Sequence, residues 1–93
     1  MPTIHLIISG KVQGVFYRAT AKDVANKMGL TGWVKNTEQG HVEIMVTGPG
    51  DLIDEYIVWC RKGPAKAKVT NVMIAPKPEE KFEGFKILKD MFF

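Results

Sequence analysis

The segment from Gly10 to Arg18 combines residue types that bind anions. It has glycines at positions 10 and 14 and ends in an arginine. Glycines let a loop bring its backbone N–H groups close to a ligand, and a helix that follows adds the positive end of its dipole. Arginine supplies a planar fork of donors suited to phosphate or carboxylate. We therefore expect a phosphate-binding loop made of Gln13, Gly14, Val15, Phe16, Tyr17 and Arg18.

Asn36 is a second residue whose position suggests chemistry. It ends the segment Gly32-Trp33-Val34-Lys35-Asn36. If this segment is a central strand that ends at the same sheet edge as the glycine loop, the amide lies near the bound anion and can hold a water molecule. An asparagine there also suits the start of a turn, so Asn36 alone decides nothing. Together with the loop, it makes Arg18 and Asn36 the candidate catalytic residues.

Apolar residues recur with two periods that divide the chain into strands and helices. The expected elements, in order, are a strand Thr3–Ser9, a helix Arg18–Met28 closed by Gly29, strands Leu30–Asn36 and His41–Gly48, a helix between Asp51 as its N-cap and Gly63-Pro64, a strand Lys68–Ala75, a loop Pro76–Glu80 and a short strand Phe82–Leu88. An apolar terminus of Met91, Phe92 and Phe93 follows.

This order predicts an α+β fold, a ferredoxin-like βαββαβ sandwich. Such a fold has an antiparallel sheet with two helices on one face, here with a short extra C-terminal strand. The 93 residues suit a single domain, 1–93, that is monomeric. Because this architecture hosts many unrelated functions, the activity must be argued from the site.

Composition narrows the classes of function. One cysteine, Cys60, cannot form an intramolecular disulfide, which favours the cytoplasm. The apolar runs are too short to span a membrane. The net charge of +3 suits small phosphorylated molecules, but basic residues are scattered rather than clustered as in nucleic-acid binders. His5 and His41 show no metal-ligand spacing with Cys60. We therefore expect no metal, no cofactor, no nucleic acid and no membrane partner.

Three other functions share this architecture. Single-stranded RNA binders stack bases on aromatic residues of central strands, and residues 41–48 contain none. Metal chaperones need paired cysteines in the first loop, which holds none. An anion-binding domain without catalysis remains open, because grip on phosphate and turnover would both use Arg18.

The two segments resemble the two signatures of the acylphosphatase family. The first is Gly10 through Arg18, and the second is Gly32-Trp33-Val34-Lys35-Asn36 followed by Gly40, Val42 and Gly48. The resemblance implies a hydrolase of acyl phosphates, such as acetyl phosphate or the acyl phosphate of a glycolytic bisphosphate, that works without metal or covalent intermediate. It also implies that Arg18 and the loop amides grip the phosphoryl group, whereas Asn36 positions the attacking water.

Overall fold

The chain alternates strands and helices in the order that its apolar pattern predicts. The structure, a computed structural model, describes residues 1–90. Its elements, in chain order, are β1 (Thr3–Lys11), α1 (Tyr17–Lys27), β2 (Thr31–Asn36), β3 (Val42–Thr47), α2 (Gly50–Lys62), β4 (Lys68–Lys77) and β5 (Phe85–Ile87). The βαββαβ order and the extra strand are confirmed. The apolar terminus expected at residues 91–93 lies outside the described residues.

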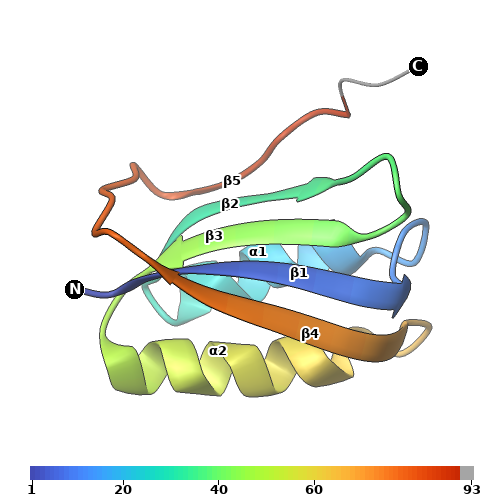
Figure 1. The fold of residues 1–93 in the computed structure, drawn as a ribbon, viewed down its shortest axis with the longest axis horizontal. Helices are drawn as coiled ribbons and strands as arrows, with labels where there is room; N and C mark the ends of the chain where they lie inside the picture. The colour runs from blue at the N-terminus through green and yellow to red at the C-terminus, as the bar shows by residue number, and fades with distance from the viewer. Residues whose placement is uncertain (91–93) are drawn as a thin grey trace.

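The strands form one five-stranded sheet in the order β4-β1-β3-β2-β5, and both helices cover the same face (Figure 1). β1, β2, β3 and β4 pair antiparallel with their neighbours, whereas β5 pairs parallel with β2. The predicted antiparallel sheet is therefore found for β1 to β4, and the extra strand β5 adds a parallel pair that makes the sheet mixed. After β4 the chain crosses to the opposite edge of the sheet, so that it reaches the free side of β2 running in the direction of β2.

The alternation along β3 shows which face of the sheet carries the core. Val42, Ile44 and Val46 are fully buried, whereas Glu43 and Met45 are partly exposed. Successive side chains of a strand point to opposite faces, so the buried set faces the helices and the other set faces solvent. Each helix meets this core with one face: Tyr17, Ala21 and Ala25 are buried on α1, and Ile53, Tyr56 and Cys60 are buried on α2.

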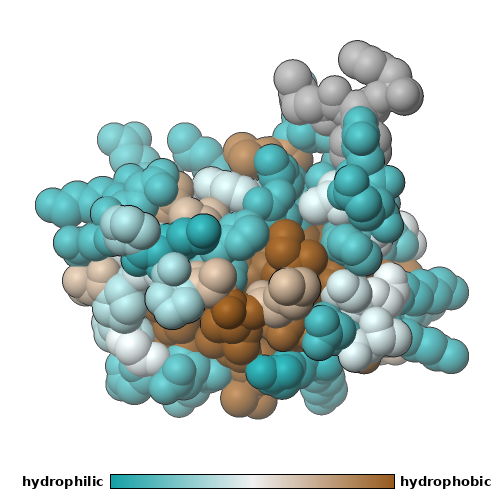
Figure 2. Space-filling model, viewed as in Figure 1, coloured by the Kyte–Doolittle hydropathy of each residue, from teal (hydrophilic) through white to brown (hydrophobic). Residues whose placement is uncertain are grey.

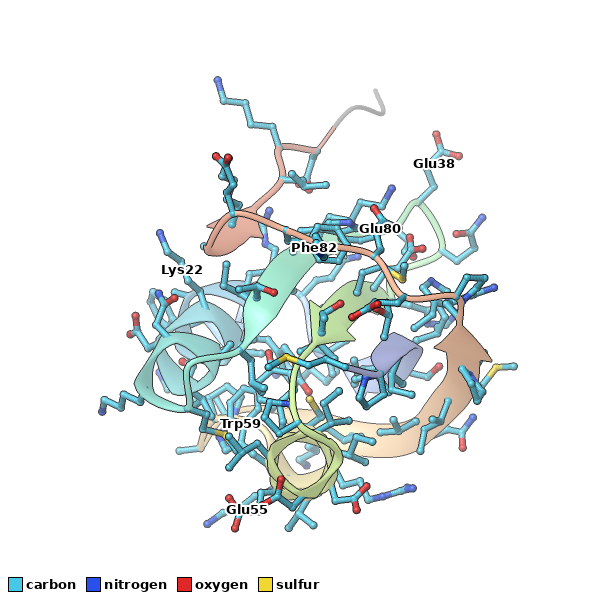
Figure 3. All side chains as sticks on the ribbon, turned by 90° about the vertical axis from the view of Figure 1, so that its left-hand side faces the viewer. Lys22, Glu38, Glu55, Trp59, Glu80 and Phe82 are labelled. Carbon is cyan, nitrogen blue, oxygen red and sulfur yellow. The ribbon has the colours of Figure 1, made fainter. Side chains whose placement is uncertain are left out.

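The aromatic residues of the core join the two helices. The Tyr17 hydroxyl donates to the carbonyl oxygen of Cys60 at 2.7 Å, and the Tyr56 hydroxyl donates to that of Ala21 at 2.9 Å. Burial raises the pKa of both phenols far above the usual value, so both stay protonated donors. Trp59, on the helix side of the sheet in Figure 3, packs against both rings. Because Tyr17 is the first residue of α1, these contacts hold the start of α1 against α2.

Several boundaries differ from the expected ones. Asp51 is not the N-cap of α2: Pro49 occupies that position, no side chain caps the helix, and Asp51 lies in the first turn, where the helix dipole favours a negative charge. β4 continues through Pro76, because an edge strand tolerates a residue without an N–H donor. β5 begins at Phe85 rather than Phe82.

The surface of the protein carries both hydrophilic and apolar side chains. Figure 2 shows apolar side chains among hydrophilic ones over β1, β4 and α2. Met73 and Ile74 of β4 are exposed, as is common for apolar residues scattered over a surface. Within residues 1–90, no helix has the length and apolar character needed to cross a membrane.

Candidate active site

Residues 12–16 join β1 to α1 at one end of the sheet, where the β2–β3 turn also lies (Figure 1). Val12 and Val15 are buried and anchor the loop in the core, whereas Phe16 is 77% exposed. Gly14 has a φ of +74°, and Phe16 has a φ of +64°. A left-handed backbone at a residue other than glycine costs about 1–2 kcal/mol. The buried valines therefore hold a conformation that the sequence of the loop does not favour by itself.

The N-terminus of α1 is open toward the loop. No side chain caps it, and its first turn contains no acidic residue. Among the described residues, the backbone N–H groups of residues 14–18 find no protein acceptor. The first turn of a helix leaves such donors unpaired and carries the positive end of the dipole. This end of α1 can therefore accept an anion.

Arg18 and Asn36 meet at this end of the sheet. Arg18 lies in the first turn of α1 with its side chain one-third exposed, and Asn36 is the last residue of β2 and only 9% exposed. Arg18 Nη1 lies 3.2 Å from Asp90 Oδ1, and Asn36 Nδ2 donates to Asp90 Oδ2 at 3.4 Å. Both predicted catalytic side chains thus contact the same carboxylate.

The carbonyl oxygen of the Asn36 amide lacks a partner. Among the described residues, Asn36 Oδ1 is the one buried side-chain polar atom without a hydrogen bond. An unsatisfied buried acceptor costs about 1–3 kcal/mol, and such cases are uncommon in folded proteins. The fold therefore holds at Asn36 an acceptor that is ready for a small donor such as water.

Arg18 and Asn36 both line a cavity of about 320 Å³. Its lining combines the loop, the start of α1 and the ends of two strands. It consists of Val12, Gly14, Phe16, Tyr17, Arg18, Ala19, Asn36 and Ile87. Phe16 and Ile87 are the large exposed apolar residues of this lining, at 77% and 39%. Cavities of this size bind small molecules, commonly with apolar walls and a few polar groups.

Three residues of the predicted phosphate loop have their side chains elsewhere. Val15 is buried in the core, and the Tyr17 hydroxyl is bound to Cys60. Gln13 Nε2 donates to the carbonyl oxygens of Thr37 and His41, at 2.9 and 2.8 Å. These residues can contribute only backbone groups to an anion, and Gln13 joins the loop to the β2–β3 turn. Their role in binding phosphate stays a prediction.

Sequence reasoning missed Ile87 and Asp90. The signal that could have found them is the direction of the last strand: a parallel partner for β2 ends at the same place as β2, beside Asn36. By contrast, His5 lies away from the cavity and pairs with Glu43 at 2.6 Å. Cys60 is fully buried, as expected.

Comparison with known proteins shows to which family the chain belongs. The family model described as Acylphosphatase matches residues 4–87. The chain belongs to the acylphosphatase family. The resemblance of the two sequence segments is thereby confirmed, and family membership assigns a hydrolase activity.

Relatives match over nearly the full chain. An acylphosphatase of Methylococcus capsulatus is 39% identical over 92 residues, which cover 98% of this chain and 100% of the relative. The crystal structure of acylphosphatase from Bacillus subtilis superposes with a TM-score of 0.93 at 32% identity, covering 96% of this chain and 100% of that one. The acylphosphatase structure from Coxiella burnetii gives 0.90 at 39% identity, covering 94% and 92%. The likeness therefore includes both the loop and the β2–β3 turn.

Proposed function

We propose that this acylphosphatase hydrolyses the carboxyl-phosphate bond by direct attack of water, without a metal ion or a covalent intermediate. The water oxygen forms a bond to phosphorus, the bond from phosphorus to the acyl oxygen breaks, and the attacking water gives up a proton to the surrounding solvent. Carboxylate and inorganic phosphate leave. The observation that carries this proposal is that Asn36, whose buried Oδ1 has no hydrogen-bond partner among the described residues, lines the same cavity as Arg18.

Arg18 and the loop hold the phosphoryl group. The guanidinium and the unpaired N–H groups at the start of α1 supply several donors from one side of the cavity. Phosphoryl transfer proceeds through a loose transition state in which charge is spread over three phosphoryl oxygens, so donors placed in advance supply most of the catalysis. One such donor is typically worth about 10²–10³-fold in kcat.

Asn36 holds the attacking water. Its Oδ1 accepts a hydrogen bond from the water, while its Nδ2 is free to donate to a phosphoryl oxygen once the Asp90 carboxylate has moved away. A carboxylic acid has a pKa near 4, so the carboxylate leaves without being protonated. Positioning the water is therefore sufficient, and no strong general base is required.

The apolar lining suits the acyl part of the substrate. Phe16 and Ile87 expose apolar surface in the same cavity as Arg18. With the phosphoryl group at Arg18, an aliphatic or aromatic acyl group can cover this surface and displace water from it. Aromatic acyl phosphates are therefore expected among the substrates.

We infer the cellular compartment from the single cysteine and the assembly state from the packing of the chain. A single buried thiol at Cys60 suits a reducing compartment, which supports a cytoplasmic enzyme. A monomer is proposed because the chain of 93 residues builds its own continuous hydrophobic core.

The test is hydrolysis of benzoyl phosphate by the purified protein, with and without EDTA and inorganic phosphate. We expect turnover that EDTA does not reduce and that phosphate inhibits competitively. Loss of turnover with EDTA would contradict the metal-free mechanism. Phosphate binding without turnover would instead indicate an anion-binding domain that has lost catalysis.

A further inference from the structure

The Asp90 carboxylate contacts the two side chains to which the proposed function assigns the phosphoryl group and the attacking water. One of its oxygens lies 3.2 Å from Arg18 Nη1, and the other accepts from Asn36 Nδ2 at 3.4 Å. Its two oxygens thus contact the two side chains to which the catalytic roles are assigned. Among the described residues, these are the interactions that the Asp90 side chain makes.

The sheet itself delivers Asp90 to this position. β5 runs parallel to β2, with Gly32 opposite Phe85 and Val34 opposite Ile87. The pairing continues one step beyond β5, because the backbone N–H of Leu88 donates to the carbonyl oxygen of Val34 at 2.9 Å. Two residues farther along each chain, the same direction brings residue 90 beside the end of β2. The strand register up to Leu88 therefore leads the chain toward Asn36.

A phosphoryl group and the Asp90 carboxylate exclude each other. Both are anions with oxygens that accept from Arg18, and a bound phosphoryl group would take the donors that Asp90 uses. Each also carries negative charge, so the two groups repel each other when both lie beside one guanidinium. Substrate binding must therefore displace the carboxylate.

Displacing the Asp90 carboxylate costs little free energy because the Arg18–Asp90 ion pair is partly solvated. The Arg18 and Asp90 side chains are 33% and 40% exposed. Ion pairs of this exposure contribute little, since water screens the charges and competes for the donors. Asp90 is therefore a weak occupant that substrate can remove, and not a permanent block.

We propose that Asp90 is an internal competitor that sets the affinity of this acylphosphatase for phosphoryl anions. This inference rests on the proposed function, because it assigns the same donors to Asp90 and to the substrate. By occupying Arg18 and Asn36 in the free enzyme, Asp90 weakens the binding of substrate and of product phosphate alike. Once substrate is bound, Asp90 has left and no longer affects the chemical step.

The test compares Asp90→Asn with Glu83→Gln. Each variant removes one negative charge from the C-terminal segment, but Glu83 is exposed and makes no side-chain contact with Arg18 or Asn36. For Asp90→Asn, the KM for benzoyl phosphate and the Ki for phosphate are expected to fall together by about two- to fivefold, the equivalent of an exposed ion pair, with kcat unchanged. Glu83→Gln is expected to match the wild type.

Two results would overturn the inference. Unchanged constants in Asp90→Asn would show that Asp90 does not compete. A raised KM or a reduced kcat would show instead that Asp90 holds Arg18 in its working position. A titration with inorganic phosphate, followed by NMR, separates this inference from the proposed function. If the wild type binds phosphate without hydrolysing benzoyl phosphate, tighter binding by Asp90→Asn still supports the competitor, and equal or absent binding refutes it.

Discussion

Replacing Gln13 by methionine tests whether the loop and the β2–β3 turn must be joined. The Gln13 amide donates to the carbonyl oxygens of Thr37 and His41, the first residue after β2 and the last before β3. These hydrogen bonds connect the phosphate loop with the segment that follows Asn36. Methionine has nearly the same length and shape as glutamine but no donor, so the change removes the connection and adds no charge.

The structure allows the expected loss to be calculated. Each hydrogen bond contributes about 0.5–1.5 kcal/mol net, so the free energy of unfolding should fall by about 1–3 kcal/mol. For a domain of this size, each kcal/mol lowers the Tm by about 4–8 °C. Arg18 and the loop amides remain one unit on α1, while Asn36 is free to shift relative to them. We therefore expect kcat to fall by about tenfold or more, because small displacements of positioned groups are costly, while the Ki for phosphate changes little.

Urea unfolding and steady-state kinetics measure both effects. Gln39→Met is the matched control, since Gln39 lies in the same turn and is exposed. It is expected to keep the stability and the kcat of the wild type. If Gln13→Met unfolds within about 0.5 kcal/mol of the wild type, the amount typical of a neutral surface substitution, and keeps its kcat, the connecting role of Gln13 is refuted.

Three further predictions concern Phe16 and Cys60. Phe16→Gly should be more stable than Phe16→Ala by about 1 kcal/mol in urea unfolding, because glycine relieves the φ of +64° and alanine does not. Phe16→Ala should lose about five- to tenfold more kcat/KM for benzoyl phosphate than for acetyl phosphate, and equal losses would refute contact between Phe16 and the acyl group. Burial raises the pKa of the Cys60 thiol to about 12. The unfolded chain therefore loses this proton first, so the stability that the thiol contributes is present below about pH 9 and is lost as the pH rises toward 12. Unfolding free energies across this range should decline less steeply for Cys60→Ala than for the wild type, and parallel slopes would contradict the shift.

The elements were predictable because their signals are local. The alternation of Val42, Ile44 and Val46 indicates a strand with one buried face, and that face is buried in the structure. The recurrence of Tyr17, Ala21 and Ala25 indicates the buried side of α1 in the same way. The order of these elements was then enough to predict the sandwich.

The features that the sequence did not predict depend on tertiary contacts. Nothing in Phe85–Ile87 distinguishes a parallel partner of β2 from an antiparallel one, because the choice depends on how residues 78–84 cross the sheet. The strained backbone at Phe16 is likewise set by the burial of Val12 and Val15 on either side of Gly14. Asp90 could not be placed in the site until the direction of β5 was known.

The most direct test of the proposed mechanism compares Asn36→Ala with Arg18→Ala in hydrolysis of benzoyl phosphate and in binding of phosphate. Because Asn36 Oδ1 is buried without a partner, removing the amide should not lower stability. We expect Asn36→Ala to fold and to lose about 10²-fold or more in kcat. It should bind phosphate within about twofold of the wild type, because the change removes a donor to phosphate and the competing Asp90 contact together. Arg18→Ala is expected to lose both binding and turnover. Asn71→Ala, an exposed asparagine on β4, is expected to match the wild type. An Asn36→Ala enzyme that keeps its kcat would contradict the assignment of the attacking water to Asn36.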